Sequence, residues 1–261
     1  MRRCLALASV CLLAFTVAGC ASSGDSSTTA DTAELTVFAA SSLTSVFTDE
    51  IGPAFEDANP GVKVVFNFAG SDALAAQIRS EGSADVFASA SGTGMDAVAG
   101  NPGVTGRTDF AQNGLVIVTP TDDPAGISSI DDLADPGVQL VLAAQGVPVG
   151  DYAREALDNA GILAAAEANV VSNEEDNASV VAKVAAGEAD AGIVYVSDVS
   201  GPAGTDLRPV EIPDDVNVIA TYPIAVVAGA PEPELAVEFV DYVTSTEGQA
   251  SLAAYGFQPV T

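Results

Sequence analysis

The chain has 261 residues, of which 36 are acidic and only 8 are basic, so its formal net charge at pH 7 is −28. A chain this acidic argues against nucleic acid as a partner. Because the sequence has no histidine, it also excludes Ser-His-Asp and Cys-His catalysis and histidine-based zinc sites. No G-x-S-x-G, Walker A or G-x-G-x-x-G motif occurs, and these absences together favour a binding protein over an enzyme.

The first 19 residues are predicted to be a lipoprotein signal peptide. Arg2 and Arg3 precede an apolar stretch at 5–17, and small residues then lead to Cys20, an order typical of secretory signals. The stretch is shorter than the roughly 20 residues that a membrane-spanning helix needs. The sequence Val-Ala-Gly-Cys resembles the lipobox of bacterial lipoproteins, which implies that Cys20 becomes the lipidated first residue and anchors the exported protein to the outer face of the cell membrane. An ordinary secretory signal with an incidental cysteine is the alternative.

A tether is expected between the anchor and the folded protein. Residues 20–33 are rich in serine, threonine and alanine, and they contain too little apolar surface to fold by themselves. Because Cys4 and Cys11 leave with the signal, no disulfide is expected. The remaining chain, about 230 residues, is long enough for one large or two medium cores.

Apolar runs rich in valine and isoleucine alternate along the chain with alanine-rich stretches of helical periodicity, a pattern typical of the α/β class. Strands are expected at 35–38, 62–68, 85–88, 115–118, 139–143, 192–195 and 224–227. Helices are expected at 43–58, 73–81, 152–159, 178–186 and 234–244.

Small or polar residues stand at four places where a loop turns into a predicted helix, namely Ser42, Ser71, the Val149-Gly150 turn and Asn177. A helix N-terminus has unpaired N–H groups and about half a positive charge, so it attracts anions without a basic side chain. In α/β sheets these loops face the crevice at the carboxyl ends of the strands. The alternative is helix capping, because Ser and Asn are preferred N-cap residues that stabilise a helix by about 1 kcal/mol.

Seven blocks of sequence, taken in order and with their spacing, resemble the molybdate-binding proteins of ABC importers. The blocks are TVFAASSLT at 36–44, FAGSDALAAQI at 68–78, ADVFASA at 84–90, VPVGDYAREAL at 147–157, GEADAGIVY at 187–195, YPIAVV at 222–227 and YGF at 255–257. Each block alone is moderately specific. Together they extend the resemblance over 35–257.

The resemblance implies a two-lobed periplasmic-binding-protein fold of type II, with mostly parallel sheets flanked by helices and a ligand cleft between the lobes. One lobe would comprise 34–114 and 223–261, and the other 115–222. The implied function is that of a monomeric substrate-binding protein, without a cofactor or enzymatic activity. It would bind molybdate or tungstate and deliver the anion to the permease of an ABC importer.

The resemblance also implies which residues contact the anion. Ser42 and Ser71 would each offer a hydroxyl and an N–H group, and Tyr195 would contribute from the end of a strand. Val149 and Asn177 would donate main-chain N–H groups, although the family often has alanine at the first of these positions and an aliphatic residue at the second. The metal would be bound only as an oxyanion, with no cation site. A buried core tyrosine is the alternative for Tyr195.

Several competing functions remain open from the sequence. A pocket made only of neutral donors suits a doubly charged tetrahedral oxyanion, which presents only acceptors, whereas hydrogen phosphate would need an acceptor as well. Sulfate or another tetrahedral oxyanion is the nearest alternative ligand. An iron(III) site formed by Tyr152, Tyr195 and Tyr222, and an anchored enzyme on the same scaffold, are the more distant ones.

Overall fold

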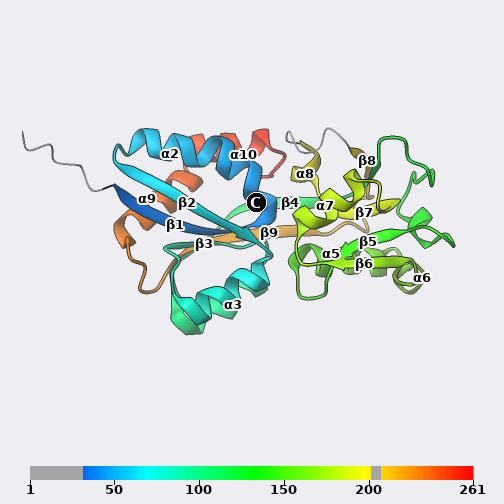
Figure 1. Cartoon of the computed structure of the whole chain (residues 1–261), viewed down its shortest axis with the longest axis horizontal. Helices are drawn as coiled ribbons and strands as arrows, with labels where there is room; N and C mark the ends of the chain where they lie inside the picture. The colour runs from blue at the N-terminus through cyan, green and yellow to red at the C-terminus, as the bar shows by residue number, and fades with distance from the viewer. Residues whose placement is uncertain (1–31, 201–206, 261) are drawn as a thin grey trace, which may run out of the picture. The chain divides into compact units, whose positions relative to one another are not determined.

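The computed structural model describes residues 32–200 and 207–260 (Figure 1). By their contacts, the residues Thr32–Thr261 form one unit. The predicted signal peptide 1–19, Cys20 and most of the tether 20–33 lie outside the described residues. In the part of the chain that is described, no helix has the length and apolar character needed to cross a membrane.

Nine strands of the described chain form one mixed sheet. In chain order they are β1 (Ala33–Ala40), β2 (Val62–Ala69), β3 (Val86–Ala88), β4 (Val104–Pro120), β5 (Leu140–Ala143), β6 (Val170–Glu174), β7 (Ala191–Tyr195), β8 (Leu207–Glu211) and β9 (Ile219–Val227). Their spatial order is β2-β1-β3-β9-β4-β7-β5-β6, with β8 paired to β4. Helices flank the sheet, so the predicted α/β class is confirmed.

Helices and short turns connect these strands. The helices are α1 (Thr44–Val46), α2 (Gly52–Ala58), α3 (Ser71–Glu81), α4 (Gly92–Val98), α5 (Pro148–Asn159), α6 (Leu163–Ala168), α7 (Asn177–Ala185), α8 (Val196–Ser200), α9 (Pro233–Thr244) and α10 (Thr246–Ala254). The 3₁₀-helices are η1 (Ser41–Leu43) and η4 (Asp131–Ala134), and the π-helices are η2 (Phe47–Ile51) and η3 (Ala99–Gly103). The helix predicted at 43–58 is therefore a succession of four segments, the end of the 3₁₀-helix η1, the α-helix α1, the π-helix η2 and the α-helix α2. Pro53 at the start of α2 has no N–H for the carbonyl four residues earlier, which accounts for the wider winding of η2.

The long strand β4 joins two halves of the sheet. The first half consists of β2, β1, β3 and β9, and the second half consists of β7, β5, β6 and β8. Its residues 104–114 pair antiparallel with β9, whereas 115–120 pair antiparallel with β7 and β8. The sequence predicted only 115–118 as strand, because charged and polar residues interrupt the apolar pattern of the first part. Strands β6 and β8 were also missed, since both are short and β8 contains a proline. The partner change in β4 coincides with the predicted lobe boundary at 114/115, but the division into lobes stays a prediction.

Two apolar layers cover the first half of the sheet. Neighbouring residues of a strand point to opposite faces, so Val37 joins the cluster of Phe47 and Phe239 while Phe38 joins that of Leu74. Figure 1 shows α2 and α10 on one side of the strands and α3 on the other. This packing holds the carboxyl ends of β1 and β2, where the polar loops begin.

In the second half, Gly192 allows α7 to pack against β7. A Cβ atom at this position would lie 2.8 Å from Val180 Cγ1 and 3.1 Å from Val184 Cγ2, both on α7. Because α7 begins at Asn177, this close approach also fixes the position of the first turn of the helix.

Replacing Gly192 with alanine tests this packing. We expect Gly192→Ala to lower the free energy of unfolding by about 1–3 kcal/mol, because the added methyl group overpacks a filled interface. Denaturant unfolding monitored by circular dichroism measures the change. Gly100→Ala is the matched control, because nothing lies within 4 Å of a Cβ there and no positive φ is required. Equal stability of the two variants would contradict the proposed role of Gly192.

Candidate functional site

All five predicted anion-contacting residues line one small cavity. Ser42 lies in η1 after β1, Ser71 begins α3 after β2, and Val149 lies in the first turn of α5 after β5. Asn177 begins α7 after β6, and Tyr195 ends β7. The structure therefore brings together segments from both halves of the sheet, at the carboxyl ends of β1, β2, β5, β6 and β7.

The helices at this cavity begin without capping by the predicted serines and asparagine. The N-cap residues of α3, α5 and α7 are Gly70, Val147 and Asp176. Only Asp176 makes a side-chain cap bond, accepting from Ser179 N at 2.8 Å. The capping alternative for Ser42, Ser71 and Asn177 is therefore wrong. Since the first N–H groups of a helix have no partner within it, three helix starts direct free donors and positive dipole ends toward one place.

Both serine hydroxyls are held by neighbouring residues. Ser71 Oγ accepts a hydrogen bond from Ala90 N at 3.0 Å, which leaves its own O–H free to donate. Ser42 Oγ lies 2.9 Å from the hydroxyl of Tyr222, and either oxygen can be the donor. When Tyr222 donates, the Ser42 O–H is also free for another acceptor. The sequence analysis did not connect Tyr222 with Ser42, because 180 residues separate them.

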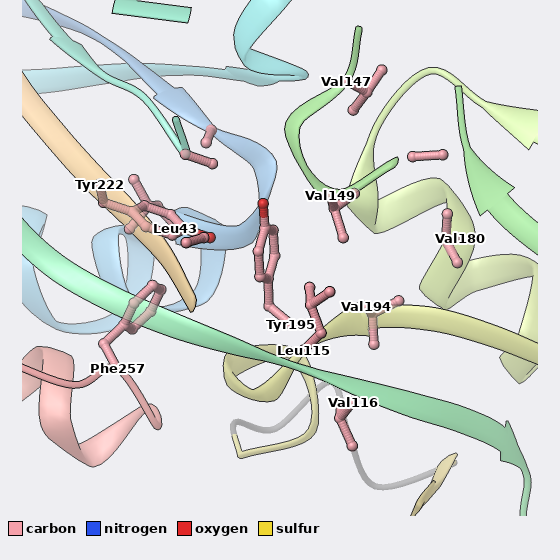
Figure 2. Close-up of a cluster of buried hydrophobic side chains, with 14 of the residues drawn as sticks. Leu43, Leu115, Val116, Val147, Val149, Val180, Val194, Tyr195, Tyr222 and Phe257 are labelled. Atoms are coloured by element: carbon pink, nitrogen blue, oxygen red, sulfur yellow. The ribbon is translucent and has the colours of Figure 1, made fainter. Parts of the chain in front are cut away.

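Tyr195 is fully buried, and its hydroxyl has no hydrogen-bond partner among the described residues. Its ring stands between Leu43 and Tyr222, which lie on η1 and β9, and the segment with Val147 and Val149 (Figure 2). Burial raises the pKa of Tyr195 well above its usual value, so the hydroxyl stays protonated and can donate. Buried tyrosine hydroxyls usually have a partner, so a role in the core alone leaves this group unexplained.

A polar pair, the buried Asn177 and the partly exposed Asp198, adjoins these donors. Asn177 Nδ2 donates to Asp198 Oδ1 at 2.7 Å, and Tyr195 N donates to Asp198 Oδ2 at 2.8 Å. Asp198 borders a second cavity, yet burial of its carboxyl group raises its pKa to about 7. Asn177 Oδ1 is buried and has no partner in the described part of the chain. The sequence analysis missed Asp198, for which the only signal was a single acidic residue three positions after Tyr195.

The cavity is narrow. Its volume is about 10 Å³, which is close to the minimum that holds one water molecule. The loops around it approach closely, since a Cβ atom on Gly70 would lie 2.7 Å from the Glu175 carbonyl oxygen. A tetrahedral oxyanion therefore requires the walls to separate from their positions in this structure.

Two larger cavities border the same helices. One, of about 250 Å³, shares Ser42 with the small cavity and is lined by Asp198 and Tyr255. The other, of about 360 Å³, lies between α3, α4 and α5 and is lined by Tyr152. Tyr152 is thus on a different cavity from Tyr195, so these contacts give no support to a three-tyrosine iron(III) site. Within residues 32–200 and 207–260, no group of three or more acidic, cysteine or histidine side chains could hold a metal ion.

Comparisons with known proteins bear on the family and the fold of this chain. Residues 35–258 match the family described as bacterial extracellular solute-binding protein. Over 224 residues the chain is 43% identical to the molybdate-binding protein ModA of Mycobacterium tuberculosis, with 85% of this chain and 84% of that one covered. It is 33% identical over 264 residues to ModA of Escherichia coli, with 98% of each covered. The solved periplasmic molybdate-binding protein of Azotobacter vinelandii has a TM-score of 0.75 at 19% identity, covering 87% of this chain and 100% of that one, which supports the fold alone.

The two buried tyrosines provide a test of the site. We expect Tyr195→Phe to raise the free energy of unfolding of the anion-free protein by about 1 kcal/mol, because it removes a buried hydroxyl that has no partner. Tyr222→Phe, the matched variant, should lower it by about 1 kcal/mol, because it breaks the contact with Ser42. Denaturant unfolding after exhaustive dialysis measures both changes. If the two variants lost the same free energy of unfolding, the Tyr195 hydroxyl would have a structural partner.

Proposed function

We propose that this chain, which belongs to the family of bacterial extracellular solute-binding proteins, captures molybdate or tungstate outside the cell membrane and delivers it to the permease of an ABC importer. The observation that carries the proposal is the meeting of Ser42, Ser71, Val149, Asn177 and Tyr195 at one cavity. The relatives named as molybdate-binding proteins support the choice of anion. The protein would act as a monomer, without a cofactor.

The chemistry of the cavity suits a tetrahedral dianion. Such an anion presents only acceptors, and hydroxyl and N–H groups are available as donors on both sides of the cavity. A hydrogen bond to a charged group contributes about 1.5–3 kcal/mol, so several of them offset the cost of removing the anion from water. The dipoles of α3, α5 and α7 replace a cationic side chain.

Anion size would determine selectivity. The N–H donors belong to the first turns of helices that are anchored by the sheet, so within each half of the sheet they cannot rearrange around a smaller ion. Sulfate, with shorter bonds, would leave some donors too far away and so bind more weakly. Sulfate or another tetrahedral oxyanion nevertheless remains the alternative ligand, because it would use the same donors.

Ligand capture would involve movement between the two halves. Ser42 and Ser71 come from the first half of the sheet, while Val149, Asn177 and Tyr195 come from the second. An anion that contacts both halves favours the state in which all donors reach it at once. The two predicted lobes would move as rigid parts, one formed by residues 34–114 and 223–261 and the other by residues 115–222. The permease would recognise the ligand-bound arrangement.

Isothermal titration of the purified protein lacking residues 1–20 tests the function. We expect one-to-one binding of molybdate and tungstate with sub-micromolar Kd, and much weaker or no binding of sulfate. Ser42→Ala combined with Ser71→Ala should raise the Kd for molybdate at least 100-fold, because two bonds of about 1.5–3 kcal/mol are lost.

Ser45→Ala is the matched control, because Ser45 lines only the larger neighbouring cavity. It should leave the Kd unchanged. Circular dichroism and thermal melting without anion check that the double variant remains folded, since Ser71 also supports Ala90 N. An unchanged affinity in the folded double variant would contradict the assignment of the site.

Lipid anchoring through Cys20 completes the proposal. In a bacterial host we expect the wild-type chain to incorporate labelled fatty acid and to fractionate with membranes. Cys20→Ala should do neither, because it lacks the thiol that carries the lipid. Cys11→Ala, a cysteine of the predicted signal peptide, should be labelled like the wild type. Labelling of the Cys20→Ala chain would contradict the anchor.

A further inference from the structure

The Asn177 amide has its two ends in different surroundings. Asn177 is only 3% exposed, and it lines the small cavity. Its Nδ2 donates to Asp198 Oδ1 at 2.7 Å, while its Oδ1 is buried without a partner among the described residues. The amide therefore gives its donor to a carboxylate and leaves an acceptor unused, in a site where a fully deprotonated oxyanion requires donors.

Turning the amide over reverses this assignment. The terminal torsion of asparagine is broad and roughly two-fold, so a half-turn is sterically permitted. Nδ2 would then be free to donate to an anion. The turned amide, however, places Oδ1 against Asp198 Oδ1, and two acceptors at hydrogen-bond distance repel each other unless a proton lies between them.

We propose that Asp198 is a positioning residue of the oxyanion site, which takes up one proton from solvent when the anion binds and thereby turns the Asn177 amide to donate to the anion. This inference rests on the proposed function. In the bound state, Asp198 Oδ1–H donates to Asn177 Oδ1, Asp198 Oδ2 keeps its bond from Tyr195 N, and Asn177 Nδ2 donates to the ligand. All the buried polar atoms of the pair then have partners.

The surroundings of Asp198 favour such a proton transfer. Burial already raises the pKa of Asp198 to about 7, and no ion pair of the described residues includes it. Its border on the cavity of about 250 Å³ gives a route for the proton from solvent. The titratable groups around it are the Tyr195 hydroxyl on β7, the Tyr222 hydroxyl on β9, and Tyr255 across the larger cavity with Asp49 beside it.

The sign of the pH dependence follows from linkage. A bound dianion disfavours a second negative charge nearby, so it raises the pKa of Asp198 further. Below about pH 6, Asp198 is protonated with or without ligand, and affinity should not depend on pH. Above pH 7, binding requires uptake of a proton, so the Kd should rise by up to about tenfold per pH unit.

Titration calorimetry from pH 6 to 8.5 tests the inference, with molybdate as the probe and the same purified protein. At pH 8, comparison of two buffers with different ionisation enthalpies should give an uptake close to one proton per molybdate bound. Asp198→Asn can donate an N–H to Asn177 Oδ1 at every pH, so it should bind at pH 8.5 about as tightly as at pH 6 and take up almost no proton. The wild-type measurement does not depend on the folding of this variant.

Asn177→Ala separates turning of the amide from simple charge repulsion. The variant keeps the main-chain N–H but lacks the amide, so it should lose most affinity at pH 6 and show a smaller Kd ratio between pH 8.5 and pH 6 than the wild type. The inference would be overturned if Asn177→Ala had the same Kd ratio between pH 8.5 and pH 6 as the wild type. It would also be overturned if the wild type bound molybdate independently of pH and without proton uptake. Either result would leave the proposed function intact. Absence of molybdate binding at every pH would overturn both.

Discussion

The antiparallel pairing of β4 with β9 is the interaction on which the site depends. β4 leaves β9 at residue 114 and continues as the partner of β7 and β8, so this one strand belongs to both halves of the sheet. Ser42 and Ser71 are fixed by β1 and β2, whereas Val149, Asn177 and Tyr195 are fixed by β5, β6 and β7. Without the β4–β9 register, the two groups of donors would have no defined separation. The same pair of strands is also where any movement between the halves must be accommodated.

An acidic chain can offer an anion site because the relevant positive potential is local. The net charge of −28 is spread over the whole sequence, and charges on an exposed surface are strongly screened beyond about 10 Å in physiological salt. Helix dipoles act within the first turn, and α3, α5 and α7 all begin at the cavity. The charge that matters most is therefore the nearest one. Asp198 is bonded to two residues of the cavity, Asn177 and Tyr195, and its raised pKa reduces the repulsion that a permanently ionised carboxylate would exert there.

Two buried polar atoms without partners mark the site as organised for something outside the chain. Among the buried side-chain nitrogen and oxygen atoms of the described residues, only the Tyr195 hydroxyl and Asn177 Oδ1 lack a hydrogen-bond partner, and both residues line the same cavity. Each such atom costs about 1–3 kcal/mol in the folded protein. On the proposed function, a bound anion would satisfy Tyr195 directly, and Asn177 through a turn of its amide, and this free energy would be recovered as affinity. The nearby Tyr222 hydroxyl, which is bonded to Ser42, is the contrasting case of a tyrosine that serves the fold.

The sequence by itself determined the α/β class and most strand positions, because apolar periodicity is a local pattern. The loops before helices indicated Ser42, Ser71, the Val149-Gly150 turn and Asn177, whereas Tyr195 and the role of all five residues were implied only by the resemblance to a family. The sequence did not determine the length and antiparallel pairing of β4, the strands β6 and β8, or the helices α4, α6, α8 and α10, because short or weakly patterned elements are specified by their neighbours. Only the tertiary structure showed that Ser71 and Asn177 begin helices rather than cap them. It alone connected Asn177 with Asp198 and Ser42 with Tyr222. Those contacts join residues on different elements, and which atoms meet there depends on the register of the whole sheet.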